Sequence, residues 1–261
     1  MRNLAWLLAF WLLGSLYGCT AGENGRAGEG TDKVELTVSA AASLREALEE
    51  AKTAFERKNP NIRIQYNFGA SGALQRQISE GAPVDLFFSA APEPFEKLKT
   101  EGLIDPEHEK TVLANELVLI VPKQGDGAVQ SLDDITRAKR VAIGLPESVP
   151  AGMYAKQTLE KAGLWKQVKP KLVYAKDVRQ VLTYVETGNV DAGFVYRTDA
   201  LVSNNVKIAA AVPSGMHDPI VYPLGVVKTS KHLKEARVFY AYLTSEQALQ
   251  TFEQQGFRRA R

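Results

Sequence analysis

Residues 38–44 read VSAAASL and residues 66–74 read YNFGASGAL, and both stretches lead from a predicted strand into a predicted helix. Each places a serine, Ser43 or Ser71, where its helix begins, among residues too small to cover the backbone. A helix start presents N–H groups without intrahelical partners and a partial positive charge, and a serine hydroxyl adds one more donor. Two such turns that face one crevice would form an anion site without a charged side chain.

Strands and helices alternate along the rest of the chain. Polar and apolar residues alternate at 34–38 and 62–66, which predicts strands, and an apolar stripe at helical spacing predicts a helix from Ser43 that ends before Pro60. The other predicted strands are 84–88, 117–121, 141–144, 172–174, 192–196, 206–212 and 221–227, and the other predicted helices are 71–80, 95–101, 153–162, 178–186, 232–243 and 246–255. This alternation predicts an α/β fold with mainly parallel sheets.

The chain is long enough for two lobes, each with its own core. Residues 33–113 together with 228–261 are predicted to form lobe 1, and residues 114–227 are predicted to form lobe 2. The strands at 117–121 and 222–227 are expected to be paired segments that cross between the lobes. Ligands of open α/β sheets bind beyond the carboxyl ends of the strands, so the expected binding place is the cleft between the lobes.

The N-terminal 32 residues are not expected to belong to this fold. Arg2 precedes an apolar run at 4–13 that is too short to span a bilayer, and residues 16–19 read LYGC. Residues 1–18 therefore resemble a bacterial lipoprotein signal peptide, with Cys19 as the lipidated residue; an ordinary secretory signal is the alternative. Residues 19–32 are rich in Gly, Glu and small polar residues and are predicted to be a flexible tether.

Charge and cysteine usage narrow the possible functions. The sequence has 32 Lys and Arg against 30 Asp and Glu, and removal of Arg2 with the signal leaves 31 basic residues. A nearly neutral chain without a long basic run argues against nucleic acid as a partner. Because Cys19 is the single cysteine, the exported domain is predicted to contain neither a disulfide nor a thiol site.

Three further turns could present donors, although each also has a purely structural explanation. Residues 146–154 read PESVPAGMY, where a proline starts a helix and Ala151 leaves its N–H unshielded. Asp177 suits a helix N-cap and would leave the N–H of Val178 free in the first turn. Tyr196 ends a predicted strand, where its hydroxyl could meet a ligand or merely pack.

Ser43 likewise has a structural explanation. Ser43 and Glu46 have the spacing of a capping box, in which the serine caps the helix and the glutamate reaches back. A hydroxyl can donate and accept at once, so a cap and a ligand contact are compatible roles.

Six segments in one order carry a family resemblance. They are AAASL at 40–44, Ser71 with LQRQI at 74–78, GAPVDLF at 81–87, PAGMYAK at 150–156, DVR at 177–179, and VY at 195–196. Together they resemble the molybdate-binding solute-binding proteins of bacterial ABC transporters, over essentially residues 33–258. The resemblance implies a two-lobed periplasmic-binding-protein-like fold of type II, with mixed, mainly parallel sheets flanked by helices. It places the oxyanion contacts on Ser43, Ser71, Ala151, Val178 and Tyr196.

The resemblance also implies the chemistry of the site. Molybdate is a tetrahedral dianion without a proton at neutral pH, so it only accepts hydrogen bonds and its site should contain donors alone. The serines and Tyr196 would give hydroxyls, and the serines would also give backbone N–H groups. Ala151 and Val178 would give backbone N–H groups only, and Asp177 is expected to turn away. A smaller tetrahedron such as sulfate would not reach all donors at good distance, whereas tungstate should be accepted.

On this interpretation the protein is a monomeric, lipid-anchored receptor on the outer side of the membrane. It would capture molybdate or tungstate and deliver it to the membrane permease of an ABC transporter. No cofactor and no cation site are expected, because molybdenum would be bound as its oxyanion.

An enzyme is the first alternative. The turn around Ser71 resembles a nucleophile elbow poorly, because Ala73 stands where a glycine should follow. The three histidines are expected at the surface: His108 in a predicted acidic loop, His217 and His232 in late segments. The sequence contains no metal-ligand spacing. A histidine or carboxylate within hydrogen-bond reach of Ser71 would favour catalysis.

Two other binding functions are alternatives to molybdate capture. A receptor of the same architecture for sulfate, thiosulfate or phosphate would be favoured by an inward-facing Arg179 or Arg197. A ligand-sensing domain of a transcription factor is rejected by the export signal and by the lack of a helix-turn-helix pattern.

Overall fold

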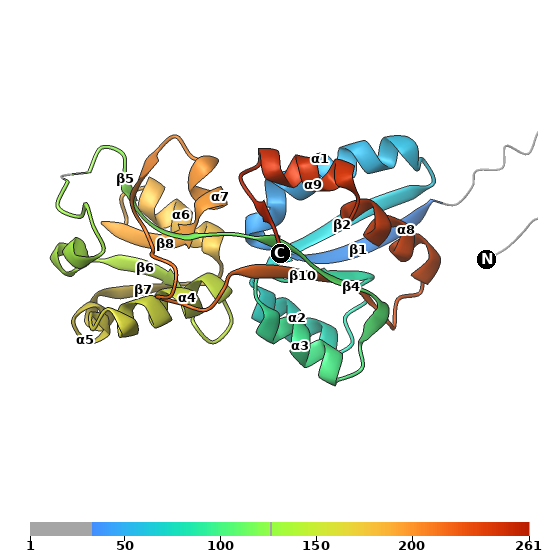
Figure 1. Cartoon of the computed structure of the whole chain (residues 1–261), viewed down its shortest axis with the longest axis horizontal. Helices are drawn as coiled ribbons and strands as arrows, with labels where there is room; N and C mark the ends of the chain where they lie inside the picture. The colour runs from blue at the N-terminus through green and yellow to red at the C-terminus, as the bar shows by residue number, and fades with distance from the viewer. Residues whose placement is uncertain (1–32, 126, 261) are drawn as a thin grey trace, which may run out of the picture. The chain divides into compact units, whose positions relative to one another are not determined.

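The computed structural model describes residues 33–125 and 127–260, so the predicted signal peptide, Cys19 and the tether lie outside the described residues. Within that part of the chain, strands form two sheets, one in each lobe (Figure 1). Sheet A has the order β11-β4-β10-β3-β1-β2, with β1 Val34–Ala41, β2 Ile62–Gly69, β3 Leu86–Phe88, β4 Ile104–Ala114, β10 Val221–Val227 and β11 Arg258–Arg259. Sheet B has the order β7-β6-β8-β5-β9, with β5 Leu117–Pro122, β6 Val141–Gly144, β7 Leu172–Ala175, β8 Ala192–Tyr196 and β9 Val206–Ala211.

Helices flank both sheets, which confirms the predicted α/β class (Figure 1). The prediction of mainly parallel sheets was wrong, because β4, β5, β9, β10 and β11 pair antiparallel with their neighbours among the described strands, and both sheets are mixed. The lobe of sheet A contains η1 Ala42–Leu44, α1 Arg45–Lys58, α2 Ser71–Ser79, α3 Pro92–Thr100, α8 Leu233–Leu243 and α9 Glu246–Gln254. The lobe of sheet B contains η2 Asp133–Arg137, α4 Pro150–Lys161, α5 Trp165–Val168, η3 Lys169–Lys171, α6 Val178–Glu186 and α7 Arg197–Leu201.

The strand register of sheet A brings the two serine-bearing turns together. β1 pairs in parallel with β2, and Ala41 at the end of β1 lies opposite Gly69 at the end of β2. Because parallel strands direct their carboxyl ends to the same edge, the turns that follow are neighbours there. Ser43 in η1 and Ser71 at the start of α2 are therefore side by side, as the sequence predicted for a shared crevice.

The predicted pairing of the crossing strands was wrong. β5 pairs with β8 and β9 in sheet B, whereas β10 pairs with β3 and β4 in sheet A. The true partner, β4, was predicted as a loop containing His108. Its sequence IDPEHEKTVLA has a proline and few apolar residues, and antiparallel pairing with β10 and β11 holds it in a strand.

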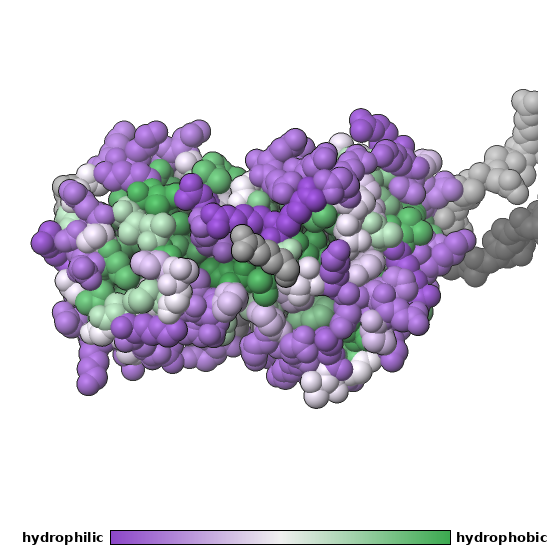
Figure 2. All heavy atoms as spheres, in the orientation of Figure 1, coloured by the Kyte–Doolittle hydropathy of each residue, from purple (hydrophilic) through white to green (hydrophobic). Residues whose placement is uncertain are grey.

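The cores are apolar and closely packed, and polar side chains dominate the outer face. Fully buried aromatic side chains include Phe55, Phe88, Phe194 and Tyr222. Figure 2 shows hydrophilic residues over much of the face in view, with apolar patches between them. Among the described residues, no helix combines the length and apolar character needed to cross a bilayer.

Candidate functional site

All five residues predicted to contact an oxyanion line one small cavity. Its lining comes from three turns of the sheet A lobe and from α4, α6 and β8 of the sheet B lobe. The lining residues are Ala41, Ala42, Ser43, Gly69, Ala70, Ser71, Ala90, Val149, Pro150, Ala151, Val178 and Tyr196. The cavity volume is about 10 Å³, on the order of the space that one water needs. None of these twelve residues is charged.

The Ser43 hydroxyl contacts a tyrosine hydroxyl, and Ser43 does not form a capping box. It lies inside η1, α1 begins only at Arg45, and no side chain caps either helix. The Ser43 hydroxyl lies 3.1 Å from the hydroxyl of Tyr222, and both side chains are buried. The predicted partner, Glu46, instead binds Arg179 across the lobes. The capping-box prediction was therefore wrong, because the short 3-10 turn moves Ser43 away from the start of α1.

Ser71 begins α2, as predicted, and its hydroxyl oxygen accepts a hydrogen bond from the backbone. The N–H of Ala90 donates to Ser71 Oγ at 2.9 Å, and both residues are buried. Because the serine oxygen accepts this bond, its own hydrogen is free to point elsewhere. Ser71 thus offers the cavity a donor.

The start of α4 supplies Ala151. Pro150 begins this helix, and Ala151 lies in the first turn, where N–H groups have no intrahelical carbonyl to bind. Gly152 lets the turn approach sheet B, because a Cβ there would lie 1.9 Å from the carbonyl oxygen of Gly144. Close packing therefore positions the backbone of Ala151 at the cavity.

The start of α6 supplies Val178. Asp177 caps this helix, and its Oδ1 accepts a bond of 2.8 Å from the N–H of Gln180. The predicted capping role of Asp177 is confirmed, and its carboxylate is not part of the cavity lining. The N–H of Val178, at the first position of the helix, is one of those without an intrahelical acceptor.

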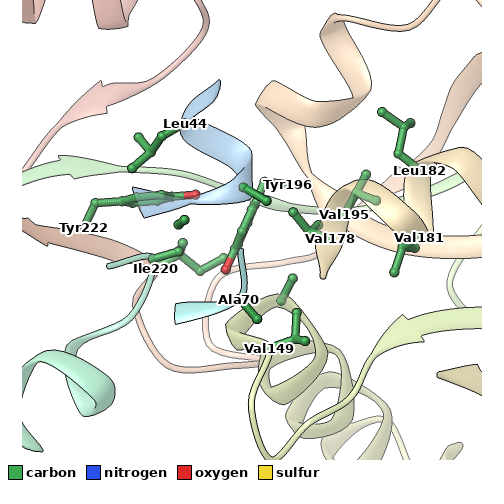
Figure 3. Packing of buried hydrophobic residues seen from close by; sticks show 14 of the residues in the cluster. Leu44, Ala70, Val149, Val178, Val181, Leu182, Val195, Tyr196, Ile220 and Tyr222 are labelled. Atoms are coloured by element: carbon green, nitrogen blue, oxygen red, sulfur yellow. The ribbon is translucent and has the colours of Figure 1, made fainter. Parts of the chain in front are cut away.

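Tyr196 is the most informative side chain of the site. It is 1% exposed, and its hydroxyl has no hydrogen-bond partner among the described residues. Figure 3 shows the hydroxyl pointing toward Ala70 and Val149, two residues of the cavity lining. Burial raises the pKa of Tyr196 well above its ordinary value, so the hydroxyl keeps its proton and is a donor. A buried unpaired donor is costly, and a ligand oxygen would satisfy it.

The two arginines near the site, Arg179 and Arg197, pair with carboxylates outside the cavity lining. Arg179 Nε lies 2.8 Å from Asp199 Oδ1, and its Nη2 binds Glu46. Arg197 lies 3.8 Å from Glu116. Neither arginine lines the cavity, so the feature that would favour a different anion is missing from the described residues.

Asp199 is fully buried, and burial raises its pKa to about 6, although Arg179 opposes this shift. Its Oδ2 also accepts a bond of 3.2 Å from the N–H of Tyr196. The ion pair between Asp199 and Arg179 thus adjoins two residues of the cavity, Tyr196 and Val178.

Catalysis by a serine of the cavity would require a general base beside its hydroxyl. No histidine or carboxylate lies among the described residues of the cavity lining, and the partner found for the Ser71 hydroxyl is a backbone N–H. His108 belongs to β4, where it lies 3.0 Å from Asp105. Asp105, Glu107 and His108 place ligand-type atoms within 4.8 Å of one another, a grouping that the sequence pattern did not indicate. Arg237 also binds Asp105, at 3.0 Å, so the guanidinium group already pairs with a carboxylate of this cluster.

Two contacts between the lobes flank the cavity and were missed by the sequence predictions. The N–H of Gly72 donates to the carbonyl of Ser148 at 3.0 Å, next to Ser71. A Cβ on Gly72 would lie 2.8 Å from that oxygen, so only glycine fits without displacement. The second contact is the ion pair of Arg179 with Glu46, next to Val178.

The comparisons with known proteins agree with this geometry. The family model of bacterial extracellular solute-binding proteins matches residues 36–258. The lipoprotein YvgL of Bacillus subtilis strain 168, whose name places it among ABC transporter substrate-binding proteins, is 52% identical over 254 residues, covering 97% of this chain and 96% of YvgL. The molybdate-binding protein ModA of Escherichia coli K12 is 38% identical over 232 residues, covering 87% of this chain and 90% of ModA.

A solved structure shares the fold. The periplasmic molybdate-binding protein of Azotobacter vinelandii superimposes with a TM-score of 0.78 at 24% identity, covering 87% of this chain and all of the other. This likeness supports the two-lobed periplasmic-binding-protein architecture. With the family match over most of its length, the chain belongs to the bacterial extracellular solute-binding proteins.

Proposed function

We propose that this protein binds molybdate, and tungstate with it, outside the cytoplasm and delivers the anion to the permease of an ABC transporter. The observation that carries the proposal is the unpaired, buried hydroxyl of Tyr196 in an uncharged cavity that Ser43, Ser71, Ala151 and Val178 also line. The names of the E. coli and A. vinelandii relatives support molybdate as the ligand.

The donor set suits a fully deprotonated tetrahedral anion. Neutral hydroxyls and backbone N–H groups stabilise a dianion through fixed dipoles, and each such bond to a charged partner contributes about 1.5–3 kcal/mol. A carboxylate in the lining would repel the dianion, and none lies among the lining residues. Binding is non-covalent, and release to the permease requires the lobes to separate.

Anchoring and lobe organisation belong to the same proposal. Cys19 is the proposed lipidation site after cleavage of residues 1–18, with residues 19–32 as the tether. We take residues 33–113 with 228–261 as one moving lobe and 114–227 as the other, in a monomeric receptor. Cys19→Ala should shift the protein from the membrane fraction to the soluble exported fraction, and unchanged membrane retention would contradict lipidation at this residue.

Isothermal titration calorimetry of the exported domain tests the function. Molybdate and tungstate should bind tightly, sulfate much more weakly because a smaller tetrahedron cannot reach all donors, and phosphate weakly because it carries a proton. Tight binding of sulfate, thiosulfate or phosphate without a response to molybdate would overturn the proposal.

A further inference from the structure

Four polar side chains form a continuous hydrogen-bonded series that ends at the cavity. Asn115, in the segment between β4 and β5, contacts Thr198 of α7 and Tyr222 of β10. Tyr222 contacts Ser43 in turn. The series therefore includes residues of both lobes and of the segment that joins them.

The direction of the series is determined at Asn115. Its Oδ1 accepts a bond of 2.8 Å from the N–H of Glu116, which identifies the other atom of the amide as Nδ2. That nitrogen has two hydrogens, and it has two acceptors, Thr198 Oγ1 at 2.9 Å and the Tyr222 hydroxyl at 3.2 Å. An amide nitrogen cannot accept, so Tyr222 receives a hydrogen bond from Asn115.

Tyr222 must then donate to Ser43. Its hydroxyl is fully buried, and burial raises its pKa well above the ordinary value, so it keeps its single hydrogen. Its other contact is Ser43 Oγ, at 3.1 Å. A hydrogen directed anywhere else would be a buried donor without a partner, which is costly. In Figure 3 the Tyr222 ring reaches toward the turn that contains Leu44.

Ser43 consequently presents its hydrogen to the cavity that it lines. The oxygen of Ser43 accepts from Tyr222, as the oxygen of Ser71 accepts from the N–H of Ala90. We propose that Asn115 and Tyr222 are positioning residues that hold Ser43 as a donor, and that they thereby make the site reject tetrahedral anions that carry a proton. This inference rests on the proposed function and assigns the discrimination against protonated anions to two residues outside the cavity lining.

The chemical consequence concerns anions of equal charge and similar size. Sulfate and hydrogen phosphate are both tetrahedral dianions, but hydrogen phosphate has one O–H that needs an acceptor. In this cavity that O–H would meet the outward hydrogen of Ser43 or Ser71, and two donors would face each other. An unsatisfied group of this kind weakens binding by roughly tenfold or more.

Tyr222→Phe tests the inference with little change in packing. The ring keeps its contacts with Tyr196 and Phe257, while the hydrogen bond to Ser43 is lost and the serine can turn. The matched control is Tyr242→Phe, which removes a buried hydroxyl that has no partner among the described residues and does not line the cavity.

The measurement is displacement of molybdate at about pH 8, where phosphate is dianionic. Sulfate is compared with hydrogen phosphate, and selenate with hydrogen arsenate as a larger matched pair. Wild type and Tyr242→Phe should prefer the proton-free anion of each pair, and Tyr222→Phe should lower this preference by roughly tenfold. A structural disturbance alone would weaken all four anions alike and leave both ratios unchanged, and that result would overturn the inference.

Asn115→Asp is a second, stronger test. A carboxylate accepts the Tyr222 hydrogen, which reverses the series and leaves Ser43 with lone pairs toward the cavity. The added charge weakens every dianion equally, so the ratio within each pair is the readout, and it should fall further than in Tyr222→Phe. Unchanged ratios in both variants would refute the positioning role, whereas wild type that fails to bind molybdate would refute the proposed function instead.

Discussion

The two lobes supply donors of different kinds to one cavity. The sheet A lobe contributes the hydroxyls of Ser43 and Ser71. The oxygen of Ser43 is hydrogen-bonded to Tyr222, and the oxygen of Ser71 accepts from the N–H of Ala90. The sheet B lobe contributes backbone N–H groups at the helix starts of Ala151 and Val178 and one hydroxyl, that of Tyr196. The lobes thus differ in that serine hydroxyls line the cavity from one lobe, whereas helix-start N–H groups and a tyrosine line it from the other.

The difference follows from how freely each donor can turn. A serine hydroxyl rotates and can present either its hydrogen or a lone pair, so Ser43 and Ser71 need a partner that determines the direction of the hydroxyl. A backbone N–H is fixed by the helix, so it needs only close approach. Close approach explains the small residues, since a Cβ on Gly152 or Gly72 would lie within 3 Å of a backbone oxygen, of Gly144 or Ser148 respectively.

The largest expected effect is a pH-dependent change in the free energy of unfolding, and it arises from the buried Asp199 in the sheet B lobe. The folded pKa of Asp199 is about 6 against an ordinary 3.8, because burial disfavours its charged form. The folded state therefore binds this proton more tightly than the unfolded chain does. The resulting stability is present below about pH 4 and is lost as pH rises through about 6, a total of about 3 kcal/mol at most.

Asp199→Asn removes this titration. Denaturant unfolding between about pH 4 and 7 should show wild type losing stability relative to the variant as pH rises. A difference between the two proteins that is independent of pH would contradict the raised pKa.

Ser71→Ala should cause the largest loss of affinity. It removes a hydroxyl that we propose contacts the anion and leaves the buried N–H of Ala90 without its acceptor, so molybdate binding should weaken roughly a hundredfold. Calorimetric titration measures the loss. Ser79→Ala, at the exposed end of the same helix, serves as the control and should bind as wild type does. Equal affinities for the two variants would count against Ser71 as a ligand contact.

Gly72→Ala tests the contact between the lobes. Its Cβ would lie 2.8 Å from the carbonyl oxygen of Ser148, so the lobes cannot reach the observed separation without displacement. Affinity for molybdate should fall roughly tenfold, and small-angle scattering should show a more extended protein with molybdate bound. A variant with wild-type affinity and compactness would exclude this contact from closure.

Glu46→Gln should have the smallest effect. It removes the ion pair with Arg179, which is partly exposed and therefore worth at most about 1 kcal/mol, or roughly fivefold in affinity. Glu49→Gln makes the same change of charge on the same helix, and its partner Lys52 lies 4.0 Å away on α1. Weaker molybdate binding in Glu46→Gln alone, diminishing with added salt, would support the ion pair; identical binding in both variants would not.

Much of the fold could be predicted because local patterns were strong. The predicted bounds of the helix Val178–Glu186 and of the strands Ala192–Tyr196 and Val221–Val227 are confirmed. The turns that carry the five proposed oxyanion contacts were also identified, through turn chemistry and the family resemblance, and all five residues line one cavity. Apolar periodicity and helix-start signals are local, and they act here in the same direction as the tertiary structure.

The rest depends on contacts that are distant in sequence. β4 is polar and contains a proline, and pairing with β10 and β11 is what makes it a strand. Tyr222 reaches Ser43 across 179 positions, and Gly72 meets Ser148 of the other lobe. No spacing in the sequence encodes these pairs, because the strand order of the sheets brings them together.

The central claim is that the cavity presents hydrogen-bond donors that a bound anion would satisfy. Tyr196→Phe tests this claim most directly. Its hydroxyl lacks a partner among the described residues, so its removal should not lower the melting temperature of the unliganded protein. Molybdate affinity should nevertheless fall roughly tenfold or more, because a charge-assisted bond is lost. Calorimetry of both proteins with and without molybdate measures the two quantities together. A lower unliganded melting temperature with unchanged molybdate affinity would contradict the account.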